Sequence, residues 1–259
     1  MYNSVANDIY RALSSHESSN YVVMSSCVST QVPHAVGIAM AMKIKGDKGR
    51  ACFGYMGDGG TSEGDVHVSL NFAGVMKAPV VLICQNNQWA ISTPGSLQTA
   101  AETIAIKALG YGIEPLRADG NDVFAVYDVV AHAAEKARRG DGPTFIELLT
   151  YRVSAHSSSD DPSRYRDEKV TEVWRHQRDP LRRTELWLQK KGWLAAGERA
   201  EMAEQLDLEV RESVARAEAA GPPALDTIVE DVFEEPTWLL REEMHELASA
   251  ARVKSPHQH

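Results

Sequence analysis

Apolar residues in the first part of the chain gather in short continuous runs, which lie beside longer segments where apolar residues recur at helical spacing. The runs are typical of buried strands and lie at 51–58, 78–87, 111–120 and 142–153. The longer segments predict helices at 33–46, 62–77, 98–108 and 121–140, of which the third is weak. This alternation predicts an α/β fold with a mainly parallel sheet and helices on both faces.

Several residues at the ends of these segments act as boundary signals. Gly46 provides a stop for the first helix. Ser62 is expected to cap the second helix, with Asp65 in the capping-box position three residues later. Asn121 or Asp122 is expected to cap the helix that precedes the last strand.

The character of the chain changes beyond the last predicted strand. Residues 154–168 are polar and rich in turn formers, which predicts a surface loop. The sequence is then helical and strongly charged over 168–220, until Gly-Pro-Pro at 221–223 interrupts it. We therefore expect an α/β domain over 1–155, followed over 156–259 by this loop and a helical C-terminal region of the same unit.

Composition and charge narrow the class of protein. The 259 residues carry a net charge of −9, with no long stretch of lysine and arginine, so nucleic acid is not an expected partner. No apolar run reaches the roughly 18 residues of a membrane span, and the N-terminus has no signal-peptide core. Cys27, Cys52 and Cys84 lack metal-ligand spacing and are expected to be free thiols of a cytoplasmic protein.

Polar residues follow two successive predicted strands. Gly57-Asp58-Gly59-Gly60 comes after the first, where glycines allow a close backbone approach and a helix N-terminus favours an anion. A carboxylate beside a phosphate requires a bridging cation, so Asp58 indicates a magnesium or calcium ion. Asn86 and Asn87 end the next strand and converge with Asp58 if the two strands are neighbours. The alternative is an ordinary turn with helix-capping residues.

The same segments carry a family resemblance. Gly-Asp-Gly, Ser-Glu-Gly-Asp at 62–65 and the Asn-Asn pair resemble the thiamine diphosphate motif of transketolase-like enzymes. The stretches SSCVSTQVPHAVGIAMAMK, DGNDVFAVYDVV and TYRVSAHSSSDDPSRYR extend it. From about Ser14 to the C-terminus, the sequence is similar to alpha subunits of the decarboxylating component of branched-chain 2-oxo acid dehydrogenase complexes. The resemblance implies a thiamine diphosphate-binding fold and oxidative decarboxylation with acyl transfer to lipoamide.

The resemblance also implies a set of cofactor-binding residues. The Asp58 and Asn87 side chains and the Trp89 backbone carbonyl would bind magnesium. Residues near the diphosphate would be Gly59, Gly60 and Gln85, the last in place of an arginine of some relatives. Ser26 and Val28 would lie near the two rings of thiamine. A loop that binds potassium in some relatives matches Ser25, Cys27, Thr30 and Gln31, with an ordinary loop before a helix as the alternative.

The loop after the last strand receives two roles from the resemblance. His156 would stabilise the diphosphate and assist acyl transfer to lipoamide, and its ordinary pKa near neutrality suits either protonation state. Ser157 matches the regulatory phosphorylation position of mitochondrial relatives, where an added dianion would clash in the substrate channel. Without a cognate kinase, we expect Ser157 to be unmodified.

The implied partners are a beta subunit, in an assembly of two alpha and two beta chains, and a lipoyl acyltransferase core. The beta subunit would supply the glutamate that activates the cofactor. Relatives carry an upstream segment that contributes to diphosphate binding, so we expect this chain alone to bind the cofactor weakly. Alternatives are a pyruvate or acetoin dehydrogenase alpha subunit, a transketolase half, or a non-catalytic truncated remnant that binds a partner.

Overall fold

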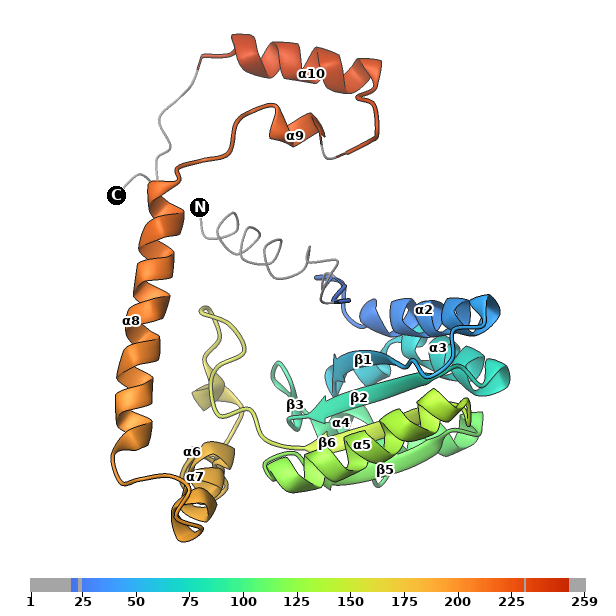
Figure 1. Ribbon diagram of the computed structural model, residues 1–259, viewed down its shortest axis with the longest axis vertical. Helices are drawn as coiled ribbons and strands as arrows, with labels where there is room; N and C mark the ends of the chain where they lie inside the picture. The colour runs from blue at the N-terminus through green and yellow to red at the C-terminus, as the bar shows by residue number, and fades with distance from the viewer. Residues whose placement is uncertain (1–19, 23–24, 231, 252–259) are drawn as a thin grey trace. The chain divides into compact units, whose positions relative to one another are not determined.

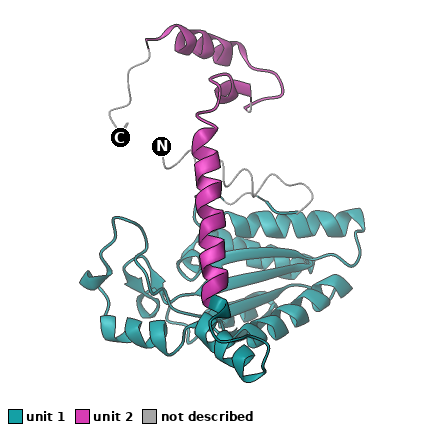
Figure 2. Cartoon of the chain, turned by 60° about the vertical axis from the view of Figure 1, so that its left-hand side comes forward, with its two compact units in different colours: residues 1–199 teal, residues 200–259 magenta. Residues whose placement is uncertain are grey.

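The computed structural model describes residues 20–22, 25–230 and 232–251. It divides the chain into two compact units, residues 1–199 and 200–259 (Figure 2). The boundary expected at 155/156 is a different division, based on the change in sequence character, and stays a prediction. Most of the polar N-terminal segment lies outside the described residues.

The first unit contains a four-stranded sheet in which every neighbouring pair is parallel (Figure 1). Its strands are β1 (Cys52–Gly57), β2 (Val80–Asn86), β5 (Glu114–Asp119) and β6 (Thr144–Leu149), arranged in the order β1-β2-β6-β5. The prediction of a parallel sheet is confirmed, and all four predicted strands are present. β6 lies between β2 and β5, so the last strand of the sequence occupies a central place in the sheet.

Helices cover both faces of this sheet, as the sequence predicts. The helices are α2 (Gln31–Lys45), α3 (Gly64–Met76) and α5 (Val123–Arg139). Successive side chains of a strand point to opposite faces of the sheet, so alternate residues of β2 contact different helices. Leu82 and Cys84 pack in the core formed with α2 and α3, whereas Val81 and Ile83 pack against α5. The continuous apolar run of β2 therefore reflects burial on both sides.

Two of the predicted helix boundaries are confirmed. Gly46 follows α2 in the left-handed conformation, with φ of 75°, and its N–H donates to the Lys43 carbonyl. Asp122 caps α5, because its side chain accepts hydrogen bonds from the N–H groups of Phe124 and Ala125. The structure thus selects Asp122 over Asn121, whose side chain instead donates to the Arg178 carbonyl.

The predicted capping box is wrong. Ser62 is the last residue of a separate 3₁₀ turn, η2 (Gly59–Ser62), and α3 begins only at Gly64. Glu63 precedes α3 without a side-chain cap, and its N–H donates to the Gly60 carbonyl. Ser62, which the sequence pattern assigned to the start of the helix, therefore belongs to the tight turn directly after β1.

The weak helix predicted at 98–108 is also wrong. This stretch contains the end of α4 (Gly95–Gln98), an irregular connection with several bends, and the start of the 3₁₀ helix η3 (Ala105–Tyr111). A short hairpin formed by β3 (Trp89–Ala90) and β4 (Thr93–Pro94) precedes it. Long-range hydrogen bonds hold the two residues that flank this connection, Gln98 and Ala105.

The rest of the described chain begins with the predicted surface loop and is mainly helical after residue 168, as predicted. It contains η4 (Pro162–Arg164), α6 (Glu168–His176), α7 (Pro180–Lys190), α8 (Glu198–Ala219), α9 (Thr227–Glu230) and α10 (Trp238–Ser249). Tyr151, just after β6, stacks on Trp174 of α6 with ring centroids 5.4 Å apart. Among the described residues, no helix combines the length and apolar character that crossing a membrane requires.

Candidate functional site

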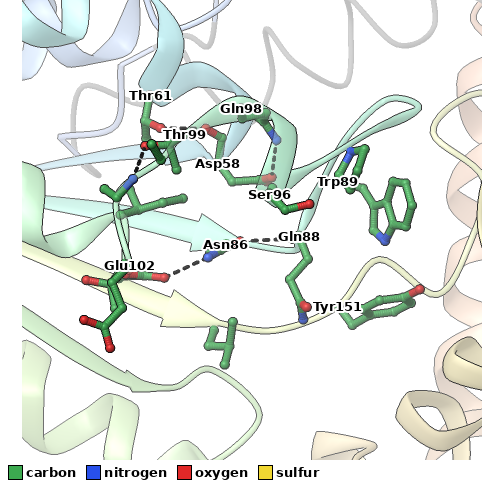
Figure 3. A pocket seen from close by; sticks show the side chains of 18 of the residues that line it. Asp58, Thr61, Asn86, Gln88, Trp89, Ser96, Gln98, Thr99, Glu102 and Tyr151 are labelled. Carbon is green, nitrogen blue, oxygen red and sulfur yellow. Dashed lines mark hydrogen bonds between the residues drawn. The ribbon is translucent and has the colours of Figure 1, made fainter.

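The carboxyl ends of the parallel strands border a cavity of about 810 Å³ in the first unit (Figure 3). Its wall includes Asp58, which follows β1, and Asn86, the last residue of β2. It also includes Trp89, which follows β2, and the buried Glu147 of β6. Ligands of α/β proteins bind at this edge of a sheet. β1 and β2 are paired neighbours, so their carboxyl ends meet at this edge. Asn86 lines the cavity with Asp58, whereas Asn87 is not among the lining residues, and its convergence with Asp58 stays a prediction.

Asp58 is buried to 2% exposure at the start of η2. Its Oδ2 accepts a hydrogen bond of 3.1 Å from the Gln98 side-chain amide, which reaches it from α4 (Figure 3). Its backbone carbonyl accepts from the Thr61 N–H and hydroxyl. Within the described ranges, Asp58 forms no ion pair with a lysine, arginine or histidine. A buried carboxylate partnered by a neutral amide is suited to binding a cation.

A tight turn after β2 presents two further oxygen atoms. The Asn87 Oδ1 accepts a hydrogen bond of 3.1 Å from the Trp89 N–H, and Gln88 between them has a positive φ of 70°. An amide oxygen has two lone pairs, so this bond leaves Asn87 able to bind an ion. The Trp89 carbonyl accepts a long hydrogen bond of 3.5 Å from Arg152. Both groups are oxygens of the kind that magnesium prefers.

The donor set of this region fits magnesium better than a transition metal. The described residues contain no cluster of three or more histidine, cysteine, aspartate and glutamate side chains. Asp58, Asn87 and Trp89 offer one carboxylate, one amide and one carbonyl, which leaves positions for phosphate and water oxygens. Cys84 lies nearby, but burial, together with Asp58 and Glu147, raises its thiol pKa, so it remains a neutral core residue.

The glycines after Asp58 have a packing role. A Cβ atom at Gly59 would lie 2.8 Å from the Ala90 Cβ, and one at Gly60 would lie 2.5 Å from the Ser29 hydroxyl. Gly57, in contrast, has open space around it. Gly59 and Gly60 are therefore required by neighbouring protein segments, in addition to any approach of a phosphate.

Ser29, which the sequence reasoning missed, supports the turn after β1 from outside the cavity wall. It is buried, has a positive φ of 67°, and donates a hydrogen bond of 2.9 Å to the Gly60 carbonyl. Ser29 thus joins the loop before α2 to the turn after β1. Ser26 and Val28, which precede Ser29 in the chain, are exposed, and Val28 retains 64% of its accessible surface. The structure does not bring these two residues to the cavity wall.

The loop predicted to bind potassium is held by its own hydrogen bonds. The Gln31 side-chain amide donates to the Ser25 carbonyl at 2.8 Å, and the Cys27 N–H donates to the Ser25 hydroxyl at 3.2 Å. The Thr30 N–H donates to the Cys27 carbonyl at 3.4 Å. These contacts gather the four predicted residues around one turn, in which the polar groups bond to one another.

Gln85 and His156 lie away from the cavity wall. Gln85 is exposed at the end of β2, opposite Gly57 in the register. The side chain of His156 is exposed, and its backbone N–H donates a hydrogen bond of 2.8 Å to Asp160. Asp160 also accepts from the hydroxyl of Tyr165, which does line the cavity. The His156 loop is therefore connected to the site through Tyr165.

Arg152 links the His156 loop to the turn after β2. It donates to the Tyr165 hydroxyl at 2.6 Å and to the Ile91 carbonyl at 2.7 Å. The hydrogen bonds from the His156 N–H and the Tyr165 hydroxyl hold the pKa of Asp160 below its ordinary value. Asp160 consequently remains an acceptor at neutral pH and keeps the loop attached.

Comparison with known proteins identifies relatives over most of the chain. A family model described as "Dehydrogenase E1 component" matches residues 7–226. The 2-oxoisovalerate dehydrogenase subunit alpha 2, mitochondrial, of Arabidopsis thaliana is 44% identical over 225 residues, which are 86% of this chain and 47% of that protein. The 3-methyl-2-oxobutanoate dehydrogenase subunit alpha of Mycobacterium tuberculosis is 52% identical over 169 residues, 65% of this chain and 46% of the relative. The chain spans about half the length of these relatives.

Proposed function

The chain belongs to the dehydrogenase E1 component family, whose members bind thiamine diphosphate, and we propose that it serves as the alpha subunit of a branched-chain 2-oxo acid dehydrogenase. The proposed reaction is oxidative decarboxylation of a branched-chain 2-oxo acid, with transfer of the acyl group to lipoamide. The names of its relatives, 2-oxoisovalerate and 3-methyl-2-oxobutanoate dehydrogenase subunit alpha, support the branched-chain substrate over pyruvate.

The observation that carries this proposal is the environment of Asp58. Its buried carboxylate contacts a neutral amide, and it lies at the wall of a large cavity beside the Trp89 turn. We propose that Asp58, the Asn87 side chain and the Trp89 carbonyl hold magnesium there. The ion would screen the diphosphate of thiamine diphosphate from the negative charge of Asp58.

When bound, thiamine diphosphate supplies the electron sink for decarboxylation, which no amino-acid side chain provides. The residues of this chain would bind and orient it. In the proposed arrangement, Gly59, Gly60 and Gln85 contact the diphosphate region, and Ser26 and Val28 lie toward the thiamine rings. Because the side chains at positions 26, 28 and 85 are exposed in the free chain, they remain available to such a ligand.

Two further roles are part of the proposal. The turn formed by Ser25, Cys27, Thr30 and Gln31 would hold potassium. The ion would replace hydrogen bonds that these residues form with one another in the free chain. His156, which lies in an exposed loop, would assist acyl transfer. Asp160 accepts a hydrogen bond from the His156 N–H and another from the Tyr165 hydroxyl, and these bonds keep the loop close to the cavity. Ser157, in the same loop, is exposed, and its hydroxyl lies 3.2 Å from that of Ser159.

The proposed partners are a beta subunit, in an assembly of two alpha and two beta chains, and a lipoyl acyltransferase core. Membership of the E1 component family supports a multienzyme complex. We propose a cytoplasmic location, which the bacterial relative supports, whereas the plant relatives are named as mitochondrial.

The test is reconstitution of the chain with a complementary beta subunit in the presence of thiamine diphosphate and magnesium. We expect calorimetric titration to show cofactor binding by the assembly. We expect turnover of 3-methyl-2-oxobutanoate to exceed turnover of pyruvate, measured as carbon dioxide release with an artificial electron acceptor. Preference for pyruvate would overturn the substrate assignment. An assembly that forms without decarboxylating either acid would overturn the enzymatic function and support a partner-binding remnant.

A further inference from the structure

Glu147 is a buried carboxylate in the middle of an apolar strand. It lies in β6, within Thr-Phe-Ile-Glu-Leu-Leu, and retains 1% of its accessible surface. Burial of an ionised carboxylate is costly unless hydrogen bonds or a counter-charge compensate it. Glu147 also lines the cavity at the carboxyl edge of the sheet. The hydrogen bonds formed by its two oxygens therefore matter for the site.

The two oxygens of Glu147 hold different segments. Oε1 accepts a hydrogen bond of 2.7 Å from the side-chain amide of Asn86, at the end of β2. Oε2 accepts one of 2.9 Å from the backbone N–H of Ala105, at the start of η3. Arg117 of the adjacent strand approaches Oε1 at 3.5 Å, with its side chain about half exposed. The carboxylate thus ties β6 to both segments that border the cavity.

The bond to Asn86 determines the shape of the turn after β2. The Asn86 Oδ1 accepts a hydrogen bond of 3.0 Å from the Gln88 N–H, while its amide nitrogen donates to Glu147. A reversed Asn86 amide would oppose donor to donor at Gln88 and acceptor to acceptor at Glu147. Glu147 therefore holds Asn86 in the one orientation that supports Gln88. This turn presents the Asn87 side chain and the Trp89 carbonyl.

The bond to Ala105 anchors the second segment. The connection before Ala105 begins at the end of α4, where Gln98 donates its hydrogen bond to Asp58. The hydrogen bond from Ala105 to β6 holds the far end of this connection, several residues of which line the cavity. One carboxylate consequently holds the turn that carries Asn87 and one end of the segment whose other end, at Gln98, bonds to Asp58.

We propose that Glu147 is a positioning residue that aligns the proposed cation ligands through Asn86 and Ala105. The proposal rests on the proposed function, because it assigns Glu147 to the same magnesium and diphosphate site. It predicts that the site loses affinity when the Glu147–Asn86 hydrogen bond is broken, although neither residue is among the proposed ligands.

The test measures Mn²⁺ affinity by electron paramagnetic resonance in the presence of thiamine diphosphate. It uses the full chain assembled with its beta subunit. Glu147→Gln keeps the size of the side chain but presents an NH₂ group to one of two donors, so one of the hydrogen bonds is lost. We expect Mn²⁺ affinity to fall by about 10- to 100-fold, as for other outer-sphere partners of metal ligands. Asn86→Ala should give a similar loss while Glu147 keeps its bond to Ala105.

The double variant N86D/E147Q provides a rescue. The introduced glutamine amide can donate to the introduced carboxylate, and its oxygen can accept from the Ala105 N–H. The carboxylate at position 86 can still accept from the Gln88 N–H. The number of carboxylates is unchanged, so most of the Mn²⁺ affinity should return. A merely structural role for Glu147 would not produce recovery from this exchange of donor and acceptor.

Thr144→Val is the matched control, because Thr144 is fully buried in the same strand but hydrogen-bonds to Glu114 at the opposite end. It should lower the free energy of unfolding without changing Mn²⁺ affinity. Wild-type Mn²⁺ affinity in both E147Q and N86A would overturn the positioning role and leave the proposed function intact. Absence of Mn²⁺ and cofactor binding by the wild-type assembly would overturn both.

Discussion

Carboxylates at the two ends of the parallel sheet have different partners. At the amino end, Glu114 of β5 lies 2.9 Å from the Lys136 ammonium and 3.1 Å from the His132 ring, both on α5. At the carboxyl end, Asp58 contacts the neutral amide of Gln98. Glu147, deeper at this end, is held by an amide side chain and a backbone N–H, with Arg117 at longer range.

This difference in partners distinguishes the structural cluster around Glu114 from the candidate binding site around Asp58. Glu114 is neutralised by side chains of its own fold, so its cluster is complete without a ligand. Asp58 is buried without an ion pair among the described residues, so a bound cation would lower its free energy. Polar residues near a sheet edge are therefore informative about binding when their charge is not compensated by the protein.

Asp58→Asn is expected to have the largest effect on the carboxyl end. It removes the charge but retains an oxygen that can accept from Gln98. We expect Mn²⁺ affinity to fall at least about 100-fold, beyond the usual effect of an outer-sphere residue. The free energy of unfolding should remain equal or rise, because a buried charge is removed. Paramagnetic resonance and urea unfolding measure the two quantities, and unchanged Mn²⁺ affinity would show that Asp58 is not a ligand.

Gly60→Ala tests how tightly the same end is packed. Its Cβ would lie 2.5 Å from the Ser29 hydroxyl, so the free energy of unfolding should fall by about 1–3 kcal/mol. Ser29 has a positive φ, so Ser29→Gly removes the obstructing oxygen without backbone strain. The double variant S29G/G60A should be more stable than the sum of the single changes predicts, as urea unfolding will measure. Additive effects would mean that Ser29 and Gly60 do not constrain each other.

Glu114→Gln tests the amino end and should have a smaller effect. The Glu114 side chain is about one-third exposed, so loss of its ion pair should cost about 0.5–1 kcal/mol of unfolding free energy at neutral pH. Mn²⁺ affinity should not change. A large change in Mn²⁺ affinity would remove the proposed distinction between the two ends.

The pH dependence of stability provides a second measurement on Glu114. Burial alone would raise its pKa, but hydrogen bonds from Lys136 and His132 place the pKa below its ordinary value. Because the folded-state pKa is depressed, the contribution of Glu114 is present above its ordinary pKa and is lost as the pH falls through the lowered one. The stability difference between wild type and E114Q should therefore shrink in acid, as urea unfolding across pH will show.

Tyr165→Phe should produce the smallest effect, confined to the His156 loop. The substitution removes the hydroxyl that bridges Arg152 and Asp160 but keeps the ring. The ring packs on Trp89, with the two ring centroids 5.4 Å apart. Amide hydrogen exchange over 154–161 should accelerate, while global unfolding remains unchanged. Tyr127→Phe, at an exposed tyrosine on α5, is the control. Equal exchange in Y165F and wild type would show that the hydroxyl does not hold the loop.

Much of the fold could be predicted from the sequence because its signals are local. Continuous apolar runs identified all four strands, and Gly46 and Asp122 marked helix ends by their own backbone and side-chain chemistry. The errors occurred where local signals were weak or were overridden. Ser62 belongs to the 3₁₀ turn after β1, and the stretch predicted as a weak helix is interrupted before Ala105, whose N–H is bound by Glu147.

The candidate site was predictable only in part, for a related reason. Asp58 and Asn87 could be identified because they follow strands, and the ends of adjacent parallel strands meet at one edge of a sheet. Ser29, Gln98 and Glu147 escaped notice, since their partners lie 31, 40 and 61 residues away in the chain. A glutamate in an otherwise apolar strand was the available signal for the last of these.

The sequence by itself determined the α/β class, the strands, the helix ends at Gly46 and Asp122 and the strand-end motifs, because hydrophobic periodicity and capping chemistry act over a few neighbouring residues. Only the tertiary structure decided the order β1-β2-β6-β5, and with it the place of β6 beside β2. That placement brings Glu147 to Asn86, and the path of the chain through α4 gives Asp58 the neutral partner Gln98. Compensation of a buried charge depends on atoms from distant segments, which only the folded chain brings together.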